Sequence, residues 1–237
     1  MEHFISHDGM RIAYQVEGEG SPLLLAHGFA STHRVNWVTT GWVKLLTDAG
    51  YRVIMTDMRG HGESGKSHEK ADYTLSTMAG DLVALLDHLG EPGADLMGYS
   101  MGAMVSLVAA MEAPERFDRI IAAGVGARLL DPKRDPGPVI AALLADDPSS
   151  VADAGARGFR VFADQNGQDR EALAACFEAV RAPFPVYGLA GIRRPVLVVA
   201  GETDVQAGEA APLAARIPGA RAFTVPRRDH MKTVGDR

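Results

Sequence analysis

The turn at residues 98–102 constrains the fold of this chain more than any other feature of its sequence. It reads Gly98-Tyr99-Ser100-Met101-Gly102, and it joins an apolar segment to a helix-like segment that begins at Met101. A strand that passes directly into a helix leaves no room for side chains at the two glycines, and it projects the central serine outward. The helix also directs its free N–H groups at this point, where they favour negative charge. Ser100 is therefore a candidate nucleophile.

Short apolar runs alternate with longer amphipathic segments along most of the chain. This alternation predicts an α/β fold with a mostly parallel, doubly wound sheet. Residues 10–16 alternate polar and apolar side chains, which favours an opening antiparallel strand. The later strands are continuous apolar runs, as expected of strands covered on both faces. We expect them at residues 22–26, 51–56, 94–99, 117–123, 195–200 and 220–225.

The segments between these strands carry helix start and stop signals. We expect helices over residues 35–49, 75–89 and 101–111, with Gly50 and Gly90 as stops after the first two. Ser76 is the expected N-cap of the second helix. Pro212 falls inside the segment between the last two strands, so the helix there is expected to be short or kinked.

The alternation of strands and helices is interrupted between residues 131 and 188. This segment opens on a proline-rich stretch, has helical patterns at about residues 139–145, 150–163 and 170–181, and contains no convincing strand. We interpret it as a helical cap inserted over one end of the sheet, with ordinary crossover helices as the alternative. The chain then divides into a core of residues 1–130 and 189–237 and a cap of residues 131–188.

Composition argues against several classes of function. The 237 residues suit one α/β domain, and 24 basic against 30 acidic residues give a formal charge of −6 without a basic cluster. Neither nucleic acid nor a membrane is therefore an expected partner. The single cysteine, Cys176, allows no internal disulfide and offers no paired metal ligand. With no signal-peptide pattern and no apolar run long enough to span a bilayer, we expect a cytoplasmic protein.

A serine hydroxyl is a weak nucleophile, so Ser100 needs a base and an acid that orients the base. In chains built on this strand–turn–helix unit the acid follows a late strand, and the histidine follows the last strand. Asp204 and His230 occupy these two positions. Glu202 and Asp131 are the alternatives for the acid.

Acyl transfer also requires donors for the oxyanion, usually two backbone N–H groups. The N–H of Met101 directly follows the candidate nucleophile. The second donor is expected from the loop after strand 22–26, which reads His27-Gly28-Phe29. We expect the N–H of Phe29 to face the pocket, and we expect the His27 ring to hold the loop rather than to carry a proton.

Together these segments resemble the α/β-hydrolase fold superfamily over nearly the whole chain. The matching segments are the His27-Gly28-Phe29 loop, the loop at residues 57–64, the turn at residues 98–102, the loop at residues 201–204 and the Asp229-His230 pair. The resemblance implies a Ser100, Asp204 and His230 triad, with Phe29 and Met101 as oxyanion donors beneath a helical cap. It implies structural roles for Asp57, Arg59 and His61.

The end of the chain departs from the pattern of this superfamily. Its members usually carry a glycine three residues before the histidine, where this chain has Arg227. They also add a closing helix, whereas only seven residues follow His230 here. Met231 and Val234 have the spacing of the first turn of such a helix.

The type of nucleophile narrows the implied chemistry. Dehalogenases and epoxide hydrolases of this fold carry an aspartate at the position of Ser100, which disfavours both activities. We expect a serine hydrolase that cleaves carboxylic esters, or related thioesters and lactones, of small apolar substrates through an acyl-enzyme. C–C bond hydrolysis and cofactor-free perhydrolysis are the alternatives within the fold, and a ligand receptor that retains the triad is a less favoured one.

The expected partner is a small ester-type molecule. No cofactor and no metal are expected, and a homodimer is possible. Aromatic residues of the predicted cap either form an apolar substrate pocket or pack the cap onto the sheet; they are Phe159, Phe162, Phe177, Phe184 and Tyr187. No basic residue stands out in the sequence as an anchor for a substrate carboxylate.

Overall fold

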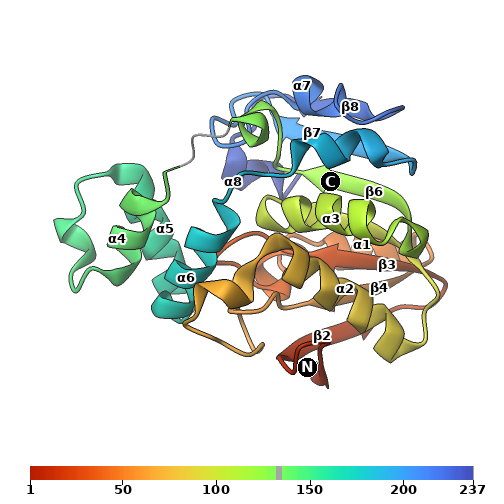
Figure 1. Ribbon diagram of the computed structural model, residues 1–237, viewed down its shortest axis with the longest axis horizontal. Coiled ribbons are helices and arrows are strands. Elements are labelled where there is room, and N and C mark those ends of the chain that lie inside the picture. The colour runs from red at the N-terminus through yellow and green to blue at the C-terminus, as the bar shows by residue number, and fades with distance from the viewer. Residues whose placement is uncertain (132–134, 237) are drawn as a thin grey trace.

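A computed structural model describes residues 1–131 and 135–236, and within them an eight-stranded sheet forms the centre of the molecule (Figure 1). The strands are β1 (Glu2–Ile5), β2 (Arg11–Glu17), β3 (Ser21–Ala26), β4 (Tyr51–Thr56), β5 (Ala94–Tyr99), β6 (Phe117–Ala123), β7 (Val196–Gly201) and β8 (Arg221–Val225). They lie in the order β1-β2-β4-β3-β5-β6-β7-β8. The β1–β2 and β2–β4 pairs are antiparallel, and the remaining pairs are parallel. The predicted mostly parallel sheet is confirmed.

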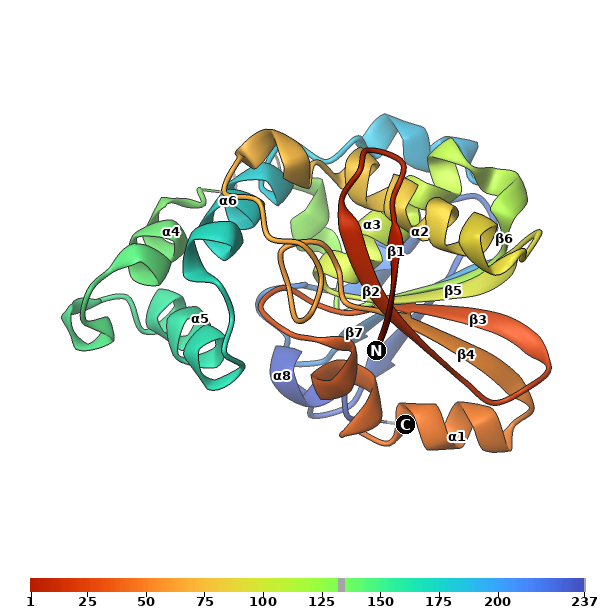
Figure 2. The same cartoon turned by 90° about the horizontal axis from the view of Figure 1, so that it is seen from below.

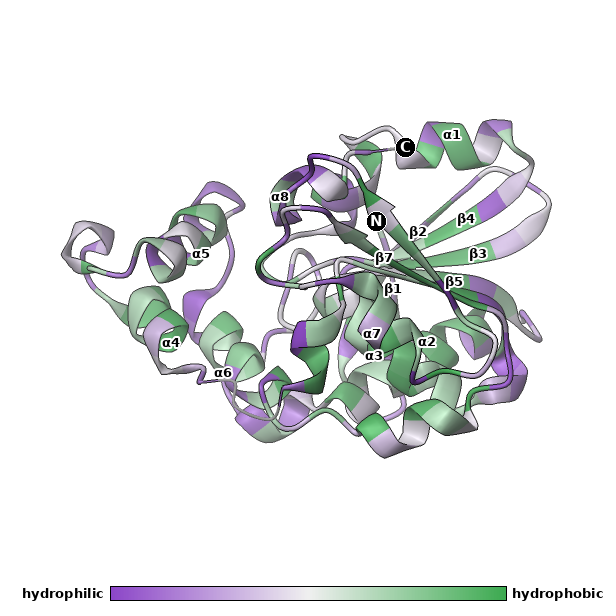
Figure 3. Cartoon of the chain, turned by 90° about the horizontal axis from the view of Figure 1, so that it is seen from above, coloured by the Kyte–Doolittle hydropathy of each residue, from purple (hydrophilic) through white to green (hydrophobic). Residues whose placement is uncertain are grey.

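Helices cover both faces of the sheet, as a doubly wound fold requires (Figures 2 and 3). One face carries α1 (Trp42–Asp48) and α8 (His230–Thr233), and the other carries α2 (Leu75–Leu89), α3 (Met101–Glu112) and α7 (Ala210–Ala214). Side chains of β3 alternate between two hydrophobic cores, with Leu24 in the core on the α2–α3 side and Leu25 in the other. Burial on both faces explains the continuous apolar runs of the central strands.

The predicted single helix over residues 35–49 is wrong. A short π-type helix spans Arg34–Val38, and α1 begins only at Trp42. Gly41 separates them with a φ of 81°, a left-handed conformation that costs glycine little. The break leaves Asn36 on the π-type turn, where its side chain reaches the 27–29 loop.

The structure corrects the predicted start of α2 and adds a first strand. Thr74, not Ser76, caps α2, because its side-chain oxygen accepts a hydrogen bond from the N–H of Thr77 at 3.0 Å. The Ser76 hydroxyl instead donates to Glu112. Strand β1 was missed in the sequence, since only one of its four side chains, that of Phe4, is buried. The short helix predicted around Pro212 is confirmed as α7, which has five residues.

Three helices lie together beside the sheet: α4 (Gly137–Leu144), α5 (Ala154–Gln165) and α6 (Arg170–Val180) (Figure 1). Helix α5 begins later than predicted because Asp153 caps it by accepting from the N–H of Ala156. The start of the predicted cap includes residues 132–134, which lie outside the described residues. The division into core and cap stays a prediction. None of the helices in the described part of the chain has the length and apolar character needed to cross a bilayer.

Candidate active site

Ser100 sits between β5 and α3 in a strained backbone conformation, with φ 53° and ψ −110°. Such a conformation is unfavourable for a residue with a side chain and persists only where its surroundings enforce it. A Cβ atom on Gly98 would lie 2.3 Å from the carbonyl oxygen of Gly102, and one on Gly102 would lie 2.1 Å from that of Ala26. Both glycines are therefore required by close packing, as the sequence predicted.

The structure brings Ser100, His230 and Asp204 into one hydrogen-bonded line. The Ser100 Oγ lies 3.0 Å from His230 Nε2, and His230 Nδ1 lies 2.7 Å from Asp204 Oδ2. A carboxylate only accepts hydrogen bonds, so Nδ1 carries the ring hydrogen and Nε2 is left to accept from the serine hydroxyl. This is the tautomer that a general base needs.

Asp204 is buried in the loop after β7, where backbone donors fix its orientation. Its Oδ1 accepts from the N–H groups of Gln206 at 3.0 Å and Ala207 at 2.9 Å, which leaves Oδ2 for His230. The two alternative acids lie elsewhere: Glu202 accepts from the N–H of Arg227, and Asp131 is exposed. Of the three candidates, the structure places Asp204 against the histidine.

His230 is the first residue of α8, and several contacts outside the predicted set hold it. The Tyr99 hydroxyl donates to the His230 carbonyl, and the two ring centroids lie 5.5 Å apart. Asp229 caps α8 by accepting from the N–H of Lys232 at 2.9 Å. The Trp42 indole donates to the Val234 carbonyl at 2.7 Å, which ties the end of the chain to α1. The helical turn predicted after the histidine is confirmed.

The 27–29 loop lies beside Ser100, and hydrogen bonds that involve His27 and Gly28 hold it in place. The N–H of Gly28 donates to Asn36 Oδ1 at 2.8 Å, while the carbonyl of Gly28 accepts from His27 Nδ1 at 2.7 Å. His27 Nε2 accepts from the N–H of Met58 at 2.9 Å. Within the described residues the N–H groups of Phe29 and Met101 have no acceptor, so both remain available to a ligand. The predicted loop-holding role of His27 is confirmed by these contacts.

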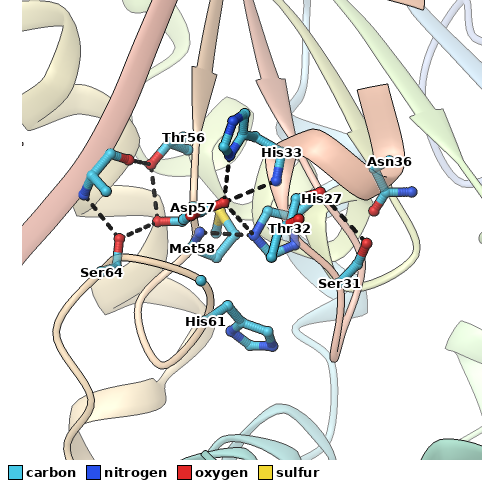
Figure 4. Close-up of polar contacts among 12 residues, drawn as sticks. His27, Ser31, Thr32, His33, Asn36, Thr56, Asp57, Met58, His61 and Ser64 are labelled. Carbon is cyan, nitrogen blue, oxygen red and sulfur yellow. Dashed lines mark hydrogen bonds and ion pairs between the residues drawn. The ribbon is translucent and has the colours of Figure 1, made fainter. Parts of the chain in front are cut away.

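A buried polar network supports this loop (Figure 4). Asp57 Oδ1 accepts from both the backbone N–H and the Nδ1 of His33, at 2.9 and 2.8 Å, and Oδ2 accepts from the N–H of Glu63. Burial alone would raise the pKa of Asp57, but the His33 hydrogen bond and the neighbouring His27 ring hold it well below its usual value. Asp57 is therefore a charged structural centre that joins the 27–33 and 57–64 segments.

His61 lies in the same network and stays neutral. Its Nδ1 donates to the Arg59 carbonyl at 2.9 Å, and its Nε2 has no hydrogen-bond partner among the described residues. Complete burial lowers the pKa of His61 to about 3. Its ring packs edge-on against Phe29, with centroids 5.7 Å apart, so it supports the loop by packing.

Two cavities meet at Ser100 and His230. The larger has a volume of about 770 Å³ and runs between the 28–40 segment, α5 and α8, with Phe159 and Phe162 in its wall. The smaller is a slot of about 50 Å³ between the segment after β6 and α6. The aromatic residues of the predicted cap divide between the two alternatives: Phe159, Phe162 and Phe177 line these cavities, whereas Phe184 is buried in the core and lines neither. Tyr187 is 95% exposed and does neither.

One group of potential metal ligands occurs in the described part of the chain, formed by His7, Asp8 and Asp81. The buried Arg59 guanidinium already donates to Asp8 at 2.8 Å and to Asp81 at 2.6 Å. These carboxylates are therefore paired with a buried cation, and neither lines the two cavities at Ser100. The arrangement suits a structural ion pair rather than a metal centre.

Comparison with known proteins assigns this fold to a family. Residues 21–150 match the family model of the alpha/beta hydrolase fold, and the chain belongs to this family. An epoxide hydrolase from Caballeronia sordidicola is 33% identical over 124 residues, which are 52% of this chain but only 37% of that enzyme. The chain thus spans well under half the length of this curated relative.

Solved structures match over nearly the whole chain. A hydrolase from Pseudomonas aeruginosa PA01 is 29% identical with a TM-score of 0.80, covering 98% of this chain and 92% of that one. The enol-lactonase from Burkholderia xenovorans LB400 has the same TM-score at 23% identity, covering 98% and 93%. The second likeness is one of fold alone.

Proposed function

We propose that this chain is a serine hydrolase that cleaves carboxylic esters, or related thioesters and lactones, of small apolar substrates through an acyl-enzyme. The observation that carries the proposal is the line of contacts from the Ser100 Oγ through His230 to Asp204, at 3.0 and 2.7 Å. A hydroxyl, an imidazole and a buried carboxylate in this order form the arrangement that activates serine for attack on a carbonyl.

The reaction then proceeds in two halves. Ser100 attacks the carbonyl carbon and its proton passes to His230 Nε2, while Asp204 stabilises the charged ring. The bond to the leaving group breaks, and the leaving alcohol takes the proton from Nε2. Water then attacks the acyl carbon as one of its protons passes to Nε2. The bond between the acyl carbon and Ser100 Oγ breaks, and Nε2 returns the proton to Oγ, so the acid leaves and the Ser100 hydroxyl is restored.

The N–H groups of Phe29 and Met101 supply the oxyanion site in this proposal. Ala26 of β3 pairs with Gly98 of β5, so the two loops leave neighbouring parallel strands at the same level. The available N–H groups stand three residues beyond this pair on each strand. Two fixed donors beside the nucleophile favour a reaction that develops negative charge on oxygen.

The type of nucleophile also argues against epoxide hydrolysis, the activity for which the Caballeronia sordidicola relative is named. Opening of an epoxide by Ser100 would form an alkyl ether, which a water molecule activated by histidine does not cleave. A carboxylate nucleophile would instead form an ester, which water can hydrolyse. Ser100 therefore favours substrates with an acyl carbon, because their serine adducts are esters that turn over.

We assign helices α4 to α6 to a cap that shapes the substrate cavity. Helix α5 contributes Phe159 and Phe162 to the larger cavity, opposite the 27–29 loop. Phe29, Phe159 and Phe177 form an aromatic cluster with centroid separations of 4.9 to 5.9 Å. This apolar wall supports binding of a small hydrophobic acyl or alcohol group.

The test compares hydrolysis of 4-nitrophenyl acetate and butyrate by the parent protein and by Ser100→Ala. We expect kcat to fall by about a thousandfold or more, with Ser76→Ala on the exposed side of α2 as the matched control. A fluorophosphonate probe should label the parent and the control, and not Ser100→Ala, as read by intact-protein mass. Equal rates in parent and Ser100→Ala would overturn the proposal. A persistent covalent adduct without turnover would favour a receptor.

A further inference from the structure

The small slot beside Ser100 differs from the larger cavity in its charge. Arg128 and Arg181 both line it, together with the apolar side chains of Met101, Val125 and Leu129. No aspartate or glutamate occurs among the described residues of its wall. The chain as a whole carries a formal charge of −6. The local charge of the slot, given by its two arginines, is therefore opposite in sign to the net charge of the protein.

Arg128 lies on a short 3-10 turn (Ala127–Leu130) that follows β6. Its backbone is fixed because its N–H donates to the Ala207 carbonyl at 3.0 Å, in the loop that also carries Asp204. Its side chain is exposed, and within residues 1–131 and 135–236 no hydrogen bond or ion pair engages its guanidinium. No described group therefore competes with a ligand for the Arg128 guanidinium.

Arg181 approaches the slot from the opposite wall, at the end of α6. Its guanidinium carbon lies 4.4 Å from the centroid of the Phe177 ring, which is itself part of the slot wall. Stacking of this kind holds the positive charge against the wall of the slot. The apolar side chains of the wall lie in the same slot as Ser100 and the two arginines.

We propose that this slot binds a carboxylate that a short aliphatic chain connects to the reacting ester or lactone carbonyl, with Arg128 as the main contact and Arg181 as the second positive charge. The inference rests on the proposed function, because it describes a substrate of the same site, and it narrows the otherwise apolar substrate to one that carries a single carboxylate. A planar guanidinium matches a carboxylate with two parallel hydrogen bonds, whereas an uncharged substrate gains nothing from it. The slot supplies the carboxylate anchor that the sequence alone did not reveal.

The test measures kcat/KM for two esters of matched length, mono-4-nitrophenyl glutarate and 4-nitrophenyl hexanoate. For Arg128→Gln we expect kcat/KM for the glutarate to fall about tenfold, mainly through KM, and hexanoate hydrolysis to change less than about twofold. Arg128→Lys should keep part of the preference and Arg128→Glu should reverse it. The control Arg221→Gln alters an exposed arginine of β8 outside both cavities and should behave as the parent.

A binding experiment separates this inference from the proposed function. Calorimetry with glutaranilic acid, an amide that resists hydrolysis, should show binding to Ser100→Ala and at least tenfold weaker binding to Ser100→Ala with Arg128→Gln. Equal loss of both esters in Arg128→Gln, or no loss of either, would overturn the carboxylate site. If Ser100→Ala retains full esterase activity, the proposed function fails, while the binding result still decides the role of Arg128.

Discussion

Asn36 offers a sharp test of how the 27–29 loop serves the site. Its Oδ1 accepts from the N–H of Gly28 at 2.8 Å, and both residues are buried. Leucine has nearly the same shape as asparagine but cannot accept a hydrogen bond. Asn36→Leu therefore removes the contact that fixes the Gly28 peptide, with little change in volume.

The expected effect of Asn36→Leu on stability and on kcat depends on the hydrogen bonds that still hold the 27–29 loop. An unpaired buried N–H costs about 1–3 kcal/mol, so the free energy of unfolding should fall by that amount. Complete loss of an oxyanion donor lowers kcat by about 10²–10³. Because His27 still holds the Gly28 carbonyl at 2.7 Å, the loop keeps part of its orientation, and we expect kcat to fall about ten- to a hundredfold. KM should change less than about twofold, since the oxyanion exists only in the transition state.

The assay is steady-state hydrolysis of 4-nitrophenyl acetate and butyrate, with urea unfolding of the same samples. Thr40→Val is the matched control, because Thr40 lines the same cavity and donates to the backbone carbonyl of Asn36. A drop in stability with unchanged kcat would refute the reasoning, since it would show that the Gly28 peptide needs no support from Asn36. An equal loss of kcat in both variants would point to general damage of the cavity.

Three further outcomes are expected. Asp204→Asn should lower ester kcat by about 10³–10⁴ with little change in KM, because an amide can stabilise the wrong histidine tautomer; a fall below tenfold would contradict this. Gly102→Ala should prevent or severely weaken folding, because its Cβ would lie 2.1 Å from the Ala26 carbonyl oxygen, whereas Gly158→Ala in open space on α5 should raise or keep the unfolding temperature. The unfolded chain binds a proton at His61 below about pH 6.5 while the folded chain resists until about pH 3, so stability should fall by about 1 kcal/mol per pH unit on acidification between these values. His61→Asn should flatten that slope in urea unfolding at pH 7 and pH 5, and an unchanged slope would argue against a neutral buried ring.

The sequence predicted every strand except β1, and the turn of the site, because both kinds of element leave local signatures. The Ser100 turn requires glycines at two fixed positions, and a strand covered on both faces requires a continuous apolar run. Asp204 and His230 could be predicted because their places after late strands follow from the chain order. Each of these rules involves residues that are near one another in the chain or are ordered along it.

The missed residues act through contacts between distant segments, which leave no such pattern. Trp42 reaches Val234 across 192 residues, and Tyr99 reaches His230 across 131. Asn36 lies in a segment whose apolar spacing predicts one continuous helix, whereas in the structure Gly41 divides this segment into two helices. Arg128 and Arg181 are far apart in the sequence, and they line one slot with Ser100 only in the folded chain.

Strand register explains how so few local rules assemble a whole site. Ala26 of β3 pairs with Gly98 of β5, and Gly201 of β7 pairs with Val225 of β8. After the first pair, β3 continues into the loop that carries Phe29, and β5 continues into the adjacent turn that carries Ser100. After the second pair, β7 and β8 continue into the adjacent loops that carry Asp204 and His230. Parallel strands make this possible because their carboxyl ends share one edge of the sheet. Because every site residue lies within a few residues of that edge, a register shift in either pair would separate the serine from its donors or the histidine from its acid.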